Sequence, residues 1–556
     1  LTRLATHWRE ADGGRRRIVW VTGEAGIGKT TLIDAFTSTL APGTLVIHGQ
    51  CVEQIGAGEP YAPVLDALST LCQVDSTVPA LLRSIAPTWR LQLPWLDDGD
   101  ARAALQRELT GATQGRMLRE LAELFERYTV NRPLLLVTED LHWSDHATIQ
   151  LLDHLARRRP GARLMWLGSC RPADAVASGH PFGSLRHELR LHGLASEIAL
   201  EPFTEQEVAD YLAYYLTGQG ISSRADPGAG HATRPRIDHD GDRPPGQQAD
   251  PLAARSTRQA PPDSFVRRLH AHTDGLPLFV AATTAELLAA GSARAPAIEW
   301  ATLALAEAPS SLAGVIDRAV DRLPVIQSRL LGFASLIGVE FRVRTAVDAA
   351  RLDPAEARTA LEVLLRHGQW LEARPLARLA DGSIDEICAF RHSLFRQVFL
   401  RRIGATDRVD AHRRILASLS ASRAIGTVVS SAELAVHAEA ALLPLEAIAH
   451  LSEAAASALA QFAPTEATHH AEAGLALLAA VADRSDGSTL TSEQRDEAEL
   501  ALTVHRGTAQ GLLRGLGDPI ARQAFERASV LCDRLAPTVP RAWFHGGIGW
   551  TWYALG

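Results

Sequence analysis

The first part of the chain alternates between short apolar runs and longer stretches in which apolar residues recur with helical spacing. Four aliphatic or β-branched runs predict strands, namely Ile18–Thr22, Thr44–His48, Leu134–Thr138 and Arg163–Ser169. The third run is continuously apolar and ends in acids, which is typical of a buried parallel strand that leads into a site. Strands alternating with helices indicate a parallel, doubly wound sheet with ligands beyond the strand ends.

Helices are predicted around these strands. We expect helices over Leu1–Arg17 (with a polar turn at its end), Thr30–Leu40 and Ala112–Arg127, and one from an N-cap at Ser144 through Leu155. The remainder of residues 60–127 is predicted to be mostly helical, with interruptions at Pro79, Pro87 and Pro94.

The pattern changes at residues 218–262. Gly, Pro, Asp, Arg and Gln dominate there and aromatic residues are absent, which predicts a disordered linker or insertion. A basic nucleic-acid-binding tail is the alternative, but the interspersed acids argue against it. Order is expected to resume near Phe265.

The C-terminal half is predicted to be mainly helical. Ser310–Arg414 combines several helices with an apparent hairpin between Gly368 and Phe390, around Asp381-Gly382, which suggests a winged helix. From about residue 430 the chain is rich in Ala and Leu. Turn breaks fall at Pro464, Asp486-Gly487 and Gly515–Pro519, and two segments resemble each other loosely, Ala467–Leu478 and Ala521–Leu535. This pattern favours an α-helical repeat array.

Composition and charge restrict the class of protein further. A chain of 556 residues should divide into about three or four domains. Its net charge of −8 argues against broad adhesion to nucleic acid, and its five cysteines form no C-x-x-C pair. No apolar run reaches membrane-spanning length and no signal peptide is visible, so we expect a cytoplasmic protein without membrane contact. Because the chain opens on Leu1 rather than Met, we expect a further segment upstream. Because the repeats stop at Gly556 without an obvious capping repeat, we expect a truncated repeat array.

The turn after the first predicted strand carries the clearest chemistry. Gly23–Thr30 fits the phosphate-binding P-loop G-x-x-x-x-G-K-[ST], between a strand and a helix. Its glycines let backbone N–H groups approach a polyphosphate, its Lys reaches the outer phosphates and its Thr hydroxyl can bind Mg²⁺. The predicted nucleotide-binding residues are Gly23, Glu24, Ala25, Gly26, Ile27, Gly28, Lys29, Thr30 and Thr31.

Lysine usage strengthens this interpretation. The chain holds 56 Lys plus Arg, and Lys29 is the only lysine among them. A compact ammonium and a forked guanidinium are not interchangeable around a cradled phosphate. The single exception therefore falls where the chemistry needs a lysine, and the sequence predicts a nucleotide-binding protein.

Two carboxylates at the end of the third predicted strand are the expected partners of the P-loop. Glu139 and Asp140 would hold Mg²⁺, together with Thr30, and orient the attacking water, with the two roles left unassigned between them. The alternative is an acidic pair that only caps the next helix.

The next strand and the neighbouring helix carry further candidates. Ser169 ends the fourth predicted strand and Arg171 follows it, where both could act as sensors of the γ-phosphate. The alternative for Arg171 is a plain surface salt bridge. Trp143 is expected to serve packing, and His142 is equally consistent with packing or chemistry. The run Arg157-Arg158-Arg159 could supply an arginine finger, but we prefer a solvated helix end.

Five motifs in order carry a resemblance to a known family. T-G-E-A-G-I-G-K-T, L-L-L-V-T-E-D-L-H-W-S-D, L-G-S-C-R-P, T-D-G-L-P-L-F and F-R-H-S-L-F-R look like those of the STAND class, the signal-transduction ATPases with numerous domains. The resembled proteins are predicted ATPases fused to winged-helix or LuxR-type transcriptional regulators or to nucleotide cyclases.

The resemblance implies a multidomain architecture with an α/β P-loop core and parallel sheet. We expect this core at 1–217, the linker at 218–262, a helical lid at 263–308, a winged-helix-like domain at 309–428 and TPR-like (tetratricopeptide-like) helical repeats at 429–556.

The resemblance also assigns roles to later residues. It places Gly275 and Pro277 against the adenine side of the nucleotide, and His392 on the phosphates of a closed, ADP-bound form. Considered by itself, His392 would be a core histidine. Two departures are expected to matter. Glu139 replaces the first of two usual aspartates, which predicts slow hydrolysis, and the longer linker puts the coupling between core and lid in doubt.

The function expected from these features is an ATP-driven regulatory switch with ATP or ADP and Mg²⁺ as cofactors. A signal ligand or protein at the C-terminal repeats would favour an open, ATP-bound form that self-associates, and hydrolysis would reset it. One rival is a DNA-engaged ATPase that uses Arg396, Arg401 and Arg402 of the winged helix, but we do not expect direct DNA binding. The other rival, a P-loop phosphotransferase, lacks an acceptor site with its own base.

Overall fold

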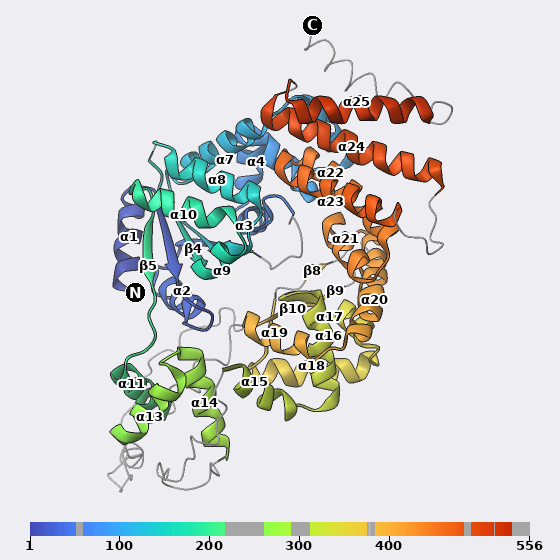
Figure 1. The fold of residues 1–556 in the computed structure, drawn as a ribbon. Helices are drawn as coiled ribbons and strands as arrows, with labels where there is room; N and C mark the ends of the chain where they lie inside the picture. The colour runs from blue at the N-terminus through green and yellow to red at the C-terminus, as the bar shows by residue number, and fades with distance from the viewer. Residues whose placement is uncertain are drawn as a thin grey trace, which may run out of the picture.

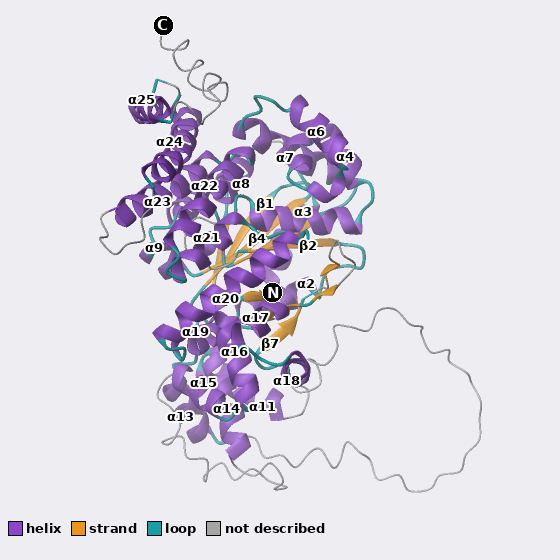
Figure 2. Ribbon diagram, turned by 90° about the vertical axis from the view of Figure 1, so that its right-hand side faces the viewer, coloured by secondary structure: helices purple, strands orange, loops and turns teal. Residues whose placement is uncertain are grey.

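The computed structural model describes residues 1–51, 59–159, 161–216, 261–290, 312–374, 377–378, 384–482, 491–515 and 517–535. Almost all of the expected linker at 218–262, together with the turns at Asp381-Gly382 and Asp486-Gly487, lies outside these ranges. In Figure 1 the chain runs from an α/β domain through two helical domains to helix pairs that return to the α/β domain. In Figure 2 the strands lie in the middle of the molecule with helices around them.

The N-terminal domain is built on a five-stranded parallel sheet with the order β2-β3-β4-β1-β5. Its strands are β1 (Arg17–Thr22), β2 (Leu45–Gln50), β3 (Leu134–Glu139), β4 (Leu164–Cys170) and β5 (Ser196–Ala199). The expected parallel sheet is confirmed. The sequence did not reveal β5, a short edge strand in which only Ile198 is buried, because so short a segment shows no apolar run.

Helices cover both faces of this sheet. One face packs on α1 (Thr2–Asp12) and α2 (Lys29–Thr37). The other face is covered mainly by α3 (Ala62–Val74), α4 (Val78–Ile85), α5 (Pro87–Leu91), α7 (Gln114–Tyr128), α8 (His146–Arg157) and α10 (Pro181–Leu191). Shorter or peripheral elements complete the domain, namely η1 (Pro94–Leu96), α6 (Gly99–Glu108), η2 (Leu141–Trp143) and α9 (Pro172–Ala177).

The helical stretch is interrupted at the three expected prolines, and one helix start differs from expectation. Pro79, Pro87 and Pro94 stand in the first turns of α4, α5 and η1, where a missing N–H removes no helical hydrogen bond. The N-cap of α8 is Asp145 rather than Ser144, because the Asp145 carboxylate accepts a hydrogen bond from the Thr148 N–H at 2.7 Å. The Ser144 hydroxyl instead donates to the Leu141 carbonyl.

The region that we expected to form a lid is a small helical unit with its own core. It contains α11 (Glu205–Leu216), α13 (Asp263–Thr273) and α14 (Pro277–Ala290). Val208 and Leu212 of α11 pack with Phe265 and Leu269 of α13 and with Val280 of α14. The boundary that we expected at residue 217 therefore moves to a point before α11, because this helix buries its apolar face against the lid helices.

The next unit combines helices with a three-stranded antiparallel sheet of order β6-β10-β7. Its helices are α15 (Leu312–Asp321), α16 (Val325–Ile337), α17 (Val343–Ala350), α18 (Pro354–His367), α19 (Ser393–Arg401) and α20 (Ala405–Ala424). Its strands are β6 (Glu340–Arg342), β7 (Leu371–Ala373) and β10 (Ile387–Phe390), with a separate ribbon of β8 (Ala377–Arg378) and β9 (Ile384–Asp385).

Consecutive helices pack in pairs at the C-terminal end of the described chain. These are α21 (Ser431–Ala440), α22 (Pro444–Ala460), α23 (Pro464–Ala482), α24 (Ser492–Arg514) and α25 (Pro519–Arg534). The array curves back so that α22, α23 and α24 lie near α7 and α8 of the sheet domain (Figure 1). Among the described helices, none combines the length and the apolar character that crossing a membrane requires.

Candidate functional site

The loop between β1 and α2 has the backbone conformation of a phosphate cradle. Gly26 and Gly28 have φ values of 81° and 95°, in the left-handed region that other residues rarely adopt. Gly28 is also the N-cap of α2, whose first amides have no acceptors within the helix. The loop therefore presents helix-start N–H groups and the positive end of the helix dipole to an anion.

Lys29 lies within this loop and is 8% exposed. Its ammonium donates to the carbonyls of Gly23 at 3.0 Å and Glu24 at 2.8 Å. Burial lowers the pKa of Lys29, and the charge of Asp140 acts in the opposite direction. The ammonium thus folds over the loop that would enclose a phosphate, in a position where it can exchange a carbonyl for a phosphate oxygen.

Thr30 and Glu139 contact each other directly. The Thr30 hydroxyl donates to a Glu139 carboxylate oxygen at 2.6 Å. Burial raises the pKa of Glu139 to about 7, with further contributions from Asp140 and Asp34, while the bond from Thr30 lowers it. A hydroxyl and a carboxylate are the hard oxygen donors that Mg²⁺ prefers, so this pair fits the cation, which would favour the ionised carboxylate.

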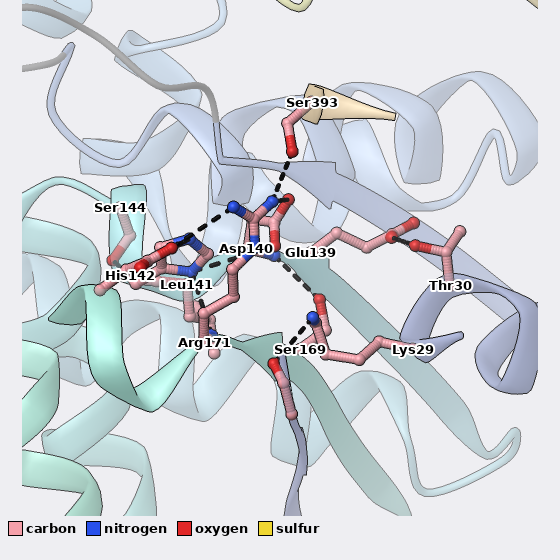
Figure 3. A network of polar contacts seen from close by, with 12 residues as sticks. Lys29, Thr30, Glu139, Asp140, Leu141, His142, Ser144, Ser169, Arg171 and Ser393 are labelled. Carbon is pink, nitrogen blue, oxygen red and sulfur yellow. Dashed lines mark hydrogen bonds and ion pairs between the residues drawn. The ribbon is translucent and has the colours of Figure 1, made fainter. Parts of the chain in front are cut away.

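Asp140 begins the turn that follows β3. Its φ of 53° is left-handed, a conformation that Asp tolerates better than most residues. Its backbone N–H donates to the Ser169 hydroxyl at 3.0 Å, which joins the ends of β3 and β4. One oxygen of its carboxylate lies 3.9 Å from Nδ1 of His142. The structure therefore brings Glu139, Asp140 and Ser169 to one edge of the sheet, as Figure 3 shows.

Arg171, which follows β4, is only 8% exposed and is held from several sides. Its guanidinium donates to the Ser393 hydroxyl at 2.6 Å and to Asp174 at 3.3 Å. It also lies 3.9 Å from a carboxylate oxygen of Asp140 and 5.0 Å from the centre of the Trp143 ring. The alternative of a plain surface salt bridge does not describe this buried group (Figure 3).

His142 and Trp143 contact different parts of Arg171. Nδ1 of His142 accepts the backbone N–H of Arg171 at 3.4 Å, so this nitrogen carries no proton. Burial, followed by the charge of Arg171, lowers the pKa of His142 to about 3. His142 therefore acts here as a neutral acceptor, whereas Trp143 supplies the face over which Arg171 lies.

His392 comes to the site from a distant part of the sequence. It is the N-cap of α19, and its Nδ1 accepts the Leu394 N–H at 3.1 Å. Burial lowers the pKa of His392 to about 3, and the charges of Arg171 and Lys29 act in the same direction. His392 therefore lies close enough to Arg171 and Lys29 for their charges to lower its pKa. Its contact with phosphate remains a prediction.

The lid contacts the phosphate-binding loop directly. The N–H of Leu278, at the start of α14, donates to the Gly26 carbonyl at 3.0 Å. Gly275 has a φ of 66°, and a Cβ atom there would lie 2.1 Å from the Phe203 carbonyl oxygen. Only glycine fits this position. The segment that contains Pro277 is therefore fixed beside the loop, and its contact with adenine stays a prediction.

Two contacts of the site were not found from the sequence. Ser393 follows His392 in the quoted motif, but nothing in the pattern indicated its bond to Arg171. Arg374, just after β7, donates to the Gln50 side chain at 3.0 Å and pairs with Glu340 at 3.2 Å. Because Gln50 lies beside Glu139 in the sheet, the charge of Arg374 opposes the raised pKa of Glu139.

Other candidate arginines lie in different surroundings. Arg157 pairs with Asp153 and Glu188, and Arg158 pairs with Glu126, as expected for a helix end rather than an arginine finger. Arg396 is buried and donates to the Ser335 carbonyl, while Arg402 pairs with Asp317 and Asp321. Arg396 and Arg402, two of the three arginines considered for DNA recognition, are therefore already bonded within the protein.

The loop, the acids and the parallel sheet together define a P-loop ATPase domain, and comparison with known families agrees. Residues 1–167 match the model of the AAA ATPase domain family. The expected class of P-loop ATPase is therefore confirmed for the N-terminal domain, which binds nucleotide. A comparison with curated protein sequences finds no match to this chain.

A comparison with solved structures finds matches that include two ATPases from Pyrococcus species. One is a STAND protein with a tetratricopeptide repeat sensor from Pyrococcus horikoshii, at 13% identity and a TM-score of 0.42, covering 98% of this chain and 67% of that one. The other is a Walker-type ATPase of Pyrococcus abyssi, at 13% identity and a TM-score of 0.29, covering 71% of this chain and 94% of that one. The class of the domain depends on the family match and on the geometry of the loop.

Proposed function

We propose that the chain is a signal-transduction switch that binds and slowly hydrolyses ATP with Mg²⁺. In this proposal ADP holds the domains closed, and exchange for ATP opens them and permits self-association. The sequence motifs of the STAND class and the family match of the N-terminal domain support it. The output would pass to a transcription regulator or another fused effector.

The hydrogen bond between Arg171 and Ser393 is the observation that carries this proposal. It joins the end of β4 in the ATPase domain to the start of α19, 222 residues later. A guanidinium that donates to Ser393 and Asp174 has fewer N–H groups left for a γ-phosphate. The group best suited to recognise ATP is thus bound by a domain that must move when the switch opens.

Each site residue has a defined task in this proposal. Lys29 and the loop amides would bind the phosphates, and Thr30 and Glu139 would hold Mg²⁺. Asp140 or Glu139 would orient water for attack. Arg171, once released from Ser393, would stabilise charge on the transferred phosphoryl group.

The helical units would control this chemistry. The unit that carries α19 would act as a winged-helix cover, with His392 near the phosphates, and the repeat array would bind the signal. A signal shifts the switch only through different affinities for the closed and open forms. The contacts of Arg396 and Arg402 favour this covering role over DNA recognition.

Equilibrium binding tests the proposal. In Ser393→Ala, Arg171 loses an acceptor in the closed form, so affinity for a non-hydrolysable ATP analogue should rise several-fold relative to that for ADP. Arg402→Ala, at an exposed ion pair on the same unit, is the matched control and should leave the ratio unchanged. An unchanged ratio in a folded Ser393→Ala chain would refute the switch.

A further inference from the structure

The repeat array contacts the ATPase domain through a buried carboxylate. Glu466, in the first turn of α23, is 1% exposed. One of its oxygens accepts the backbone N–H of Ala147 at 2.7 Å. Ala147 belongs to the first turn of α8, 319 residues earlier in the chain.

This contact completes the cap of α8. The first amides of a helix have no acceptors within the helix and need others. The Asp145 carboxylate accepts the N–H groups of Thr148 and Tyr61, at 2.7 Å and 2.8 Å. Glu466 accepts the neighbouring amide of Ala147. The start of α8 is therefore capped partly by its own residue and partly by the repeat array.

The surroundings of Glu466 are unusual for a carboxylate. Asp145, also buried, is the charged neighbour with the largest electrostatic effect on Glu466, and it has the same sign. Within the described part of the chain, the second oxygen of Glu466 has no hydrogen-bond partner. Burial, followed by Asp145, raises the pKa of Glu466 to about 7. Hydrogen bonds from the backbone N–H groups of Glu466, Ala147 and His146 lower the pKa of Glu466 and so offset this cost only in part.

Apolar packing surrounds this polar contact. Small residues of the array belong to the same hydrophobic cluster as the helices of the ATPase domain, namely Ala458, Ala463, Ala467 and Ala509. The ring of His146, on α8, packs edge-on against His469 of α23 at 5.0 Å between centres. The junction is thus continuous with a core, and water has little access to the bond between Glu466 and Ala147.

A short, internally bonded turn links this helix start to the catalytic acids. The Trp143 N–H donates to the Asp140 carbonyl at 2.8 Å, and the Ser144 hydroxyl donates to the Leu141 carbonyl at 2.8 Å. His180 bonds the Ser144 carbonyl at 2.7 Å. The turn therefore connects the start of α8 to Asp140 and Trp143, both of which lie against Arg171.

We propose that Glu466 is a positioning residue through which the repeat array fixes the start of α8 and the turn after β3. Docked, it holds Asp140 and Trp143 in the arrangement that keeps Arg171 bonded to Ser393. A signal that draws α23 away removes this cap and loosens the turn. This role rests on the proposed switch, whose regulation it specifies.

Hydrogen exchange of the full, nucleotide-free chain tests the contact itself. In Glu466→Ala, amide exchange in a peptide spanning residues 144–150 should accelerate by about tenfold or more, because Ala147 loses its acceptor. Glu466→Gln keeps an acceptor oxygen and should retain most of the protection. Glu472→Ala, at an exposed carboxylate on the same helix, is the matched control and should change nothing.

Nucleotide kinetics test the coupling. The ADP dissociation rate should rise several-fold in Glu466→Ala and return close to the original value in Glu466→Gln, with thermal unfolding confirming that both are folded. Unchanged exchange in Glu466→Ala would overturn the positioning role, and so would faster exchange with unchanged ADP release. If Glu466→Ala alters exchange but the parent chain binds no nucleotide, the proposed switch fails and the contact stands.

Discussion

The ATPase domain meets the rest of the chain at two junctions built in different ways. At the junction with α19, a hydroxyl and two carboxylates surround the guanidinium of Arg171. At the junction with α23, alanines of the array share a hydrophobic cluster with the ATPase domain. The described unit around α19 keeps a separate cluster, which includes Val398 and Phe399.

This difference suits the two junctions to different ligands, one to nucleotide and the other to a signal. A polar junction can exchange its partners for phosphate oxygens with little loss of apolar burial, so it suits the recognition of nucleotide. A junction inside a core separates only when something else covers its apolar surface or provides compensating binding energy. The repeat junction therefore suits the recognition of a signal with its own binding energy.

The largest expected effect is the loss of nucleotide binding, because nucleotide is the ligand that the polar junction would recognise. Lys29→Ala takes away the only lysine ammonium in the chain, so no neighbouring lysine can replace it. We expect affinity for ATP and ADP to fall at least about a hundredfold, measured by titration calorimetry. Lys29→Arg should fail as well, because a forked guanidinium does not fit the position of a compact ammonium. Retained affinity would contradict the assignment of the loop.

The next largest effect is a loss of stability on substitution at the apolar junction. Ala467 is fully buried there, and Ala467→Asp would place an unpaired charge in the shared cluster. We expect a loss of about 3–5 kcal/mol in the free energy of unfolding, measured by chemical denaturation. Ala473→Asp, at an exposed position on the same helix, is the control and should stay within about 0.5 kcal/mol. Equal effects would mean that the junction is not part of a core.

The polar junction should yield a smaller coupling energy. A double-mutant cycle with Arg171→Ala and Ser393→Ala should give about 1.5–3 kcal/mol, as for a hydrogen bond to a charged group. The readout is the free energy of unfolding without nucleotide. Additive losses would show that the two residues do not interact in solution, and Arg402→Ala paired with Arg171→Ala should be additive.

The smallest effect is the pH dependence of docking at α8. Because the docked pKa of Glu466 is raised to about 7 from 4.5, docking favours the protonated acid and weakens as pH rises through this interval. His146, with its pKa lowered to about 4, acts in the opposite direction below about pH 6.5. Asp145 and Tyr61 also interact electrostatically with Glu466.

Between pH 6.5 and pH 8, Glu466 should therefore dominate. Hydrogen exchange in the peptide 144–150, corrected for its intrinsic pH dependence, should accelerate several-fold over this range. Glu466→Gln should remove the dependence, because an amide does not ionise. A Gln variant with the parent's pH profile would assign the titration to another group.

Local patterns were sufficient to predict the P-loop ATPase class and most of the sheet. The P-loop and the acids after β3 are contiguous in sequence, and their chemistry depends on spacing that the sequence displays. Strand β5 was not predicted because its segment is short and only one of its residues is buried. Helix α11 was placed in the core because its partners in the lid lie beyond the linker, so no local signal showed which face it buries.

The contacts between domains could not be predicted in the same way. Ser393 and Glu466 meet partners 222 and 319 residues away. Neither stands out in composition: one is a serine at a helix start, and the other is a glutamate in a first turn, where acids are common. Only the packing of whole domains brings each to its partner.

The solitary lysine makes the phosphate site addressable by a covalent reporter. An acyl phosphate derivative of ATP transfers its acyl group to a nearby amine, and Lys29 is the one lysine amine that these 556 residues offer. Its lowered pKa increases the fraction that is neutral and nucleophilic. The mass added per chain would then report directly the fraction of molecules in a mixture whose phosphate site binds the nucleotide derivative.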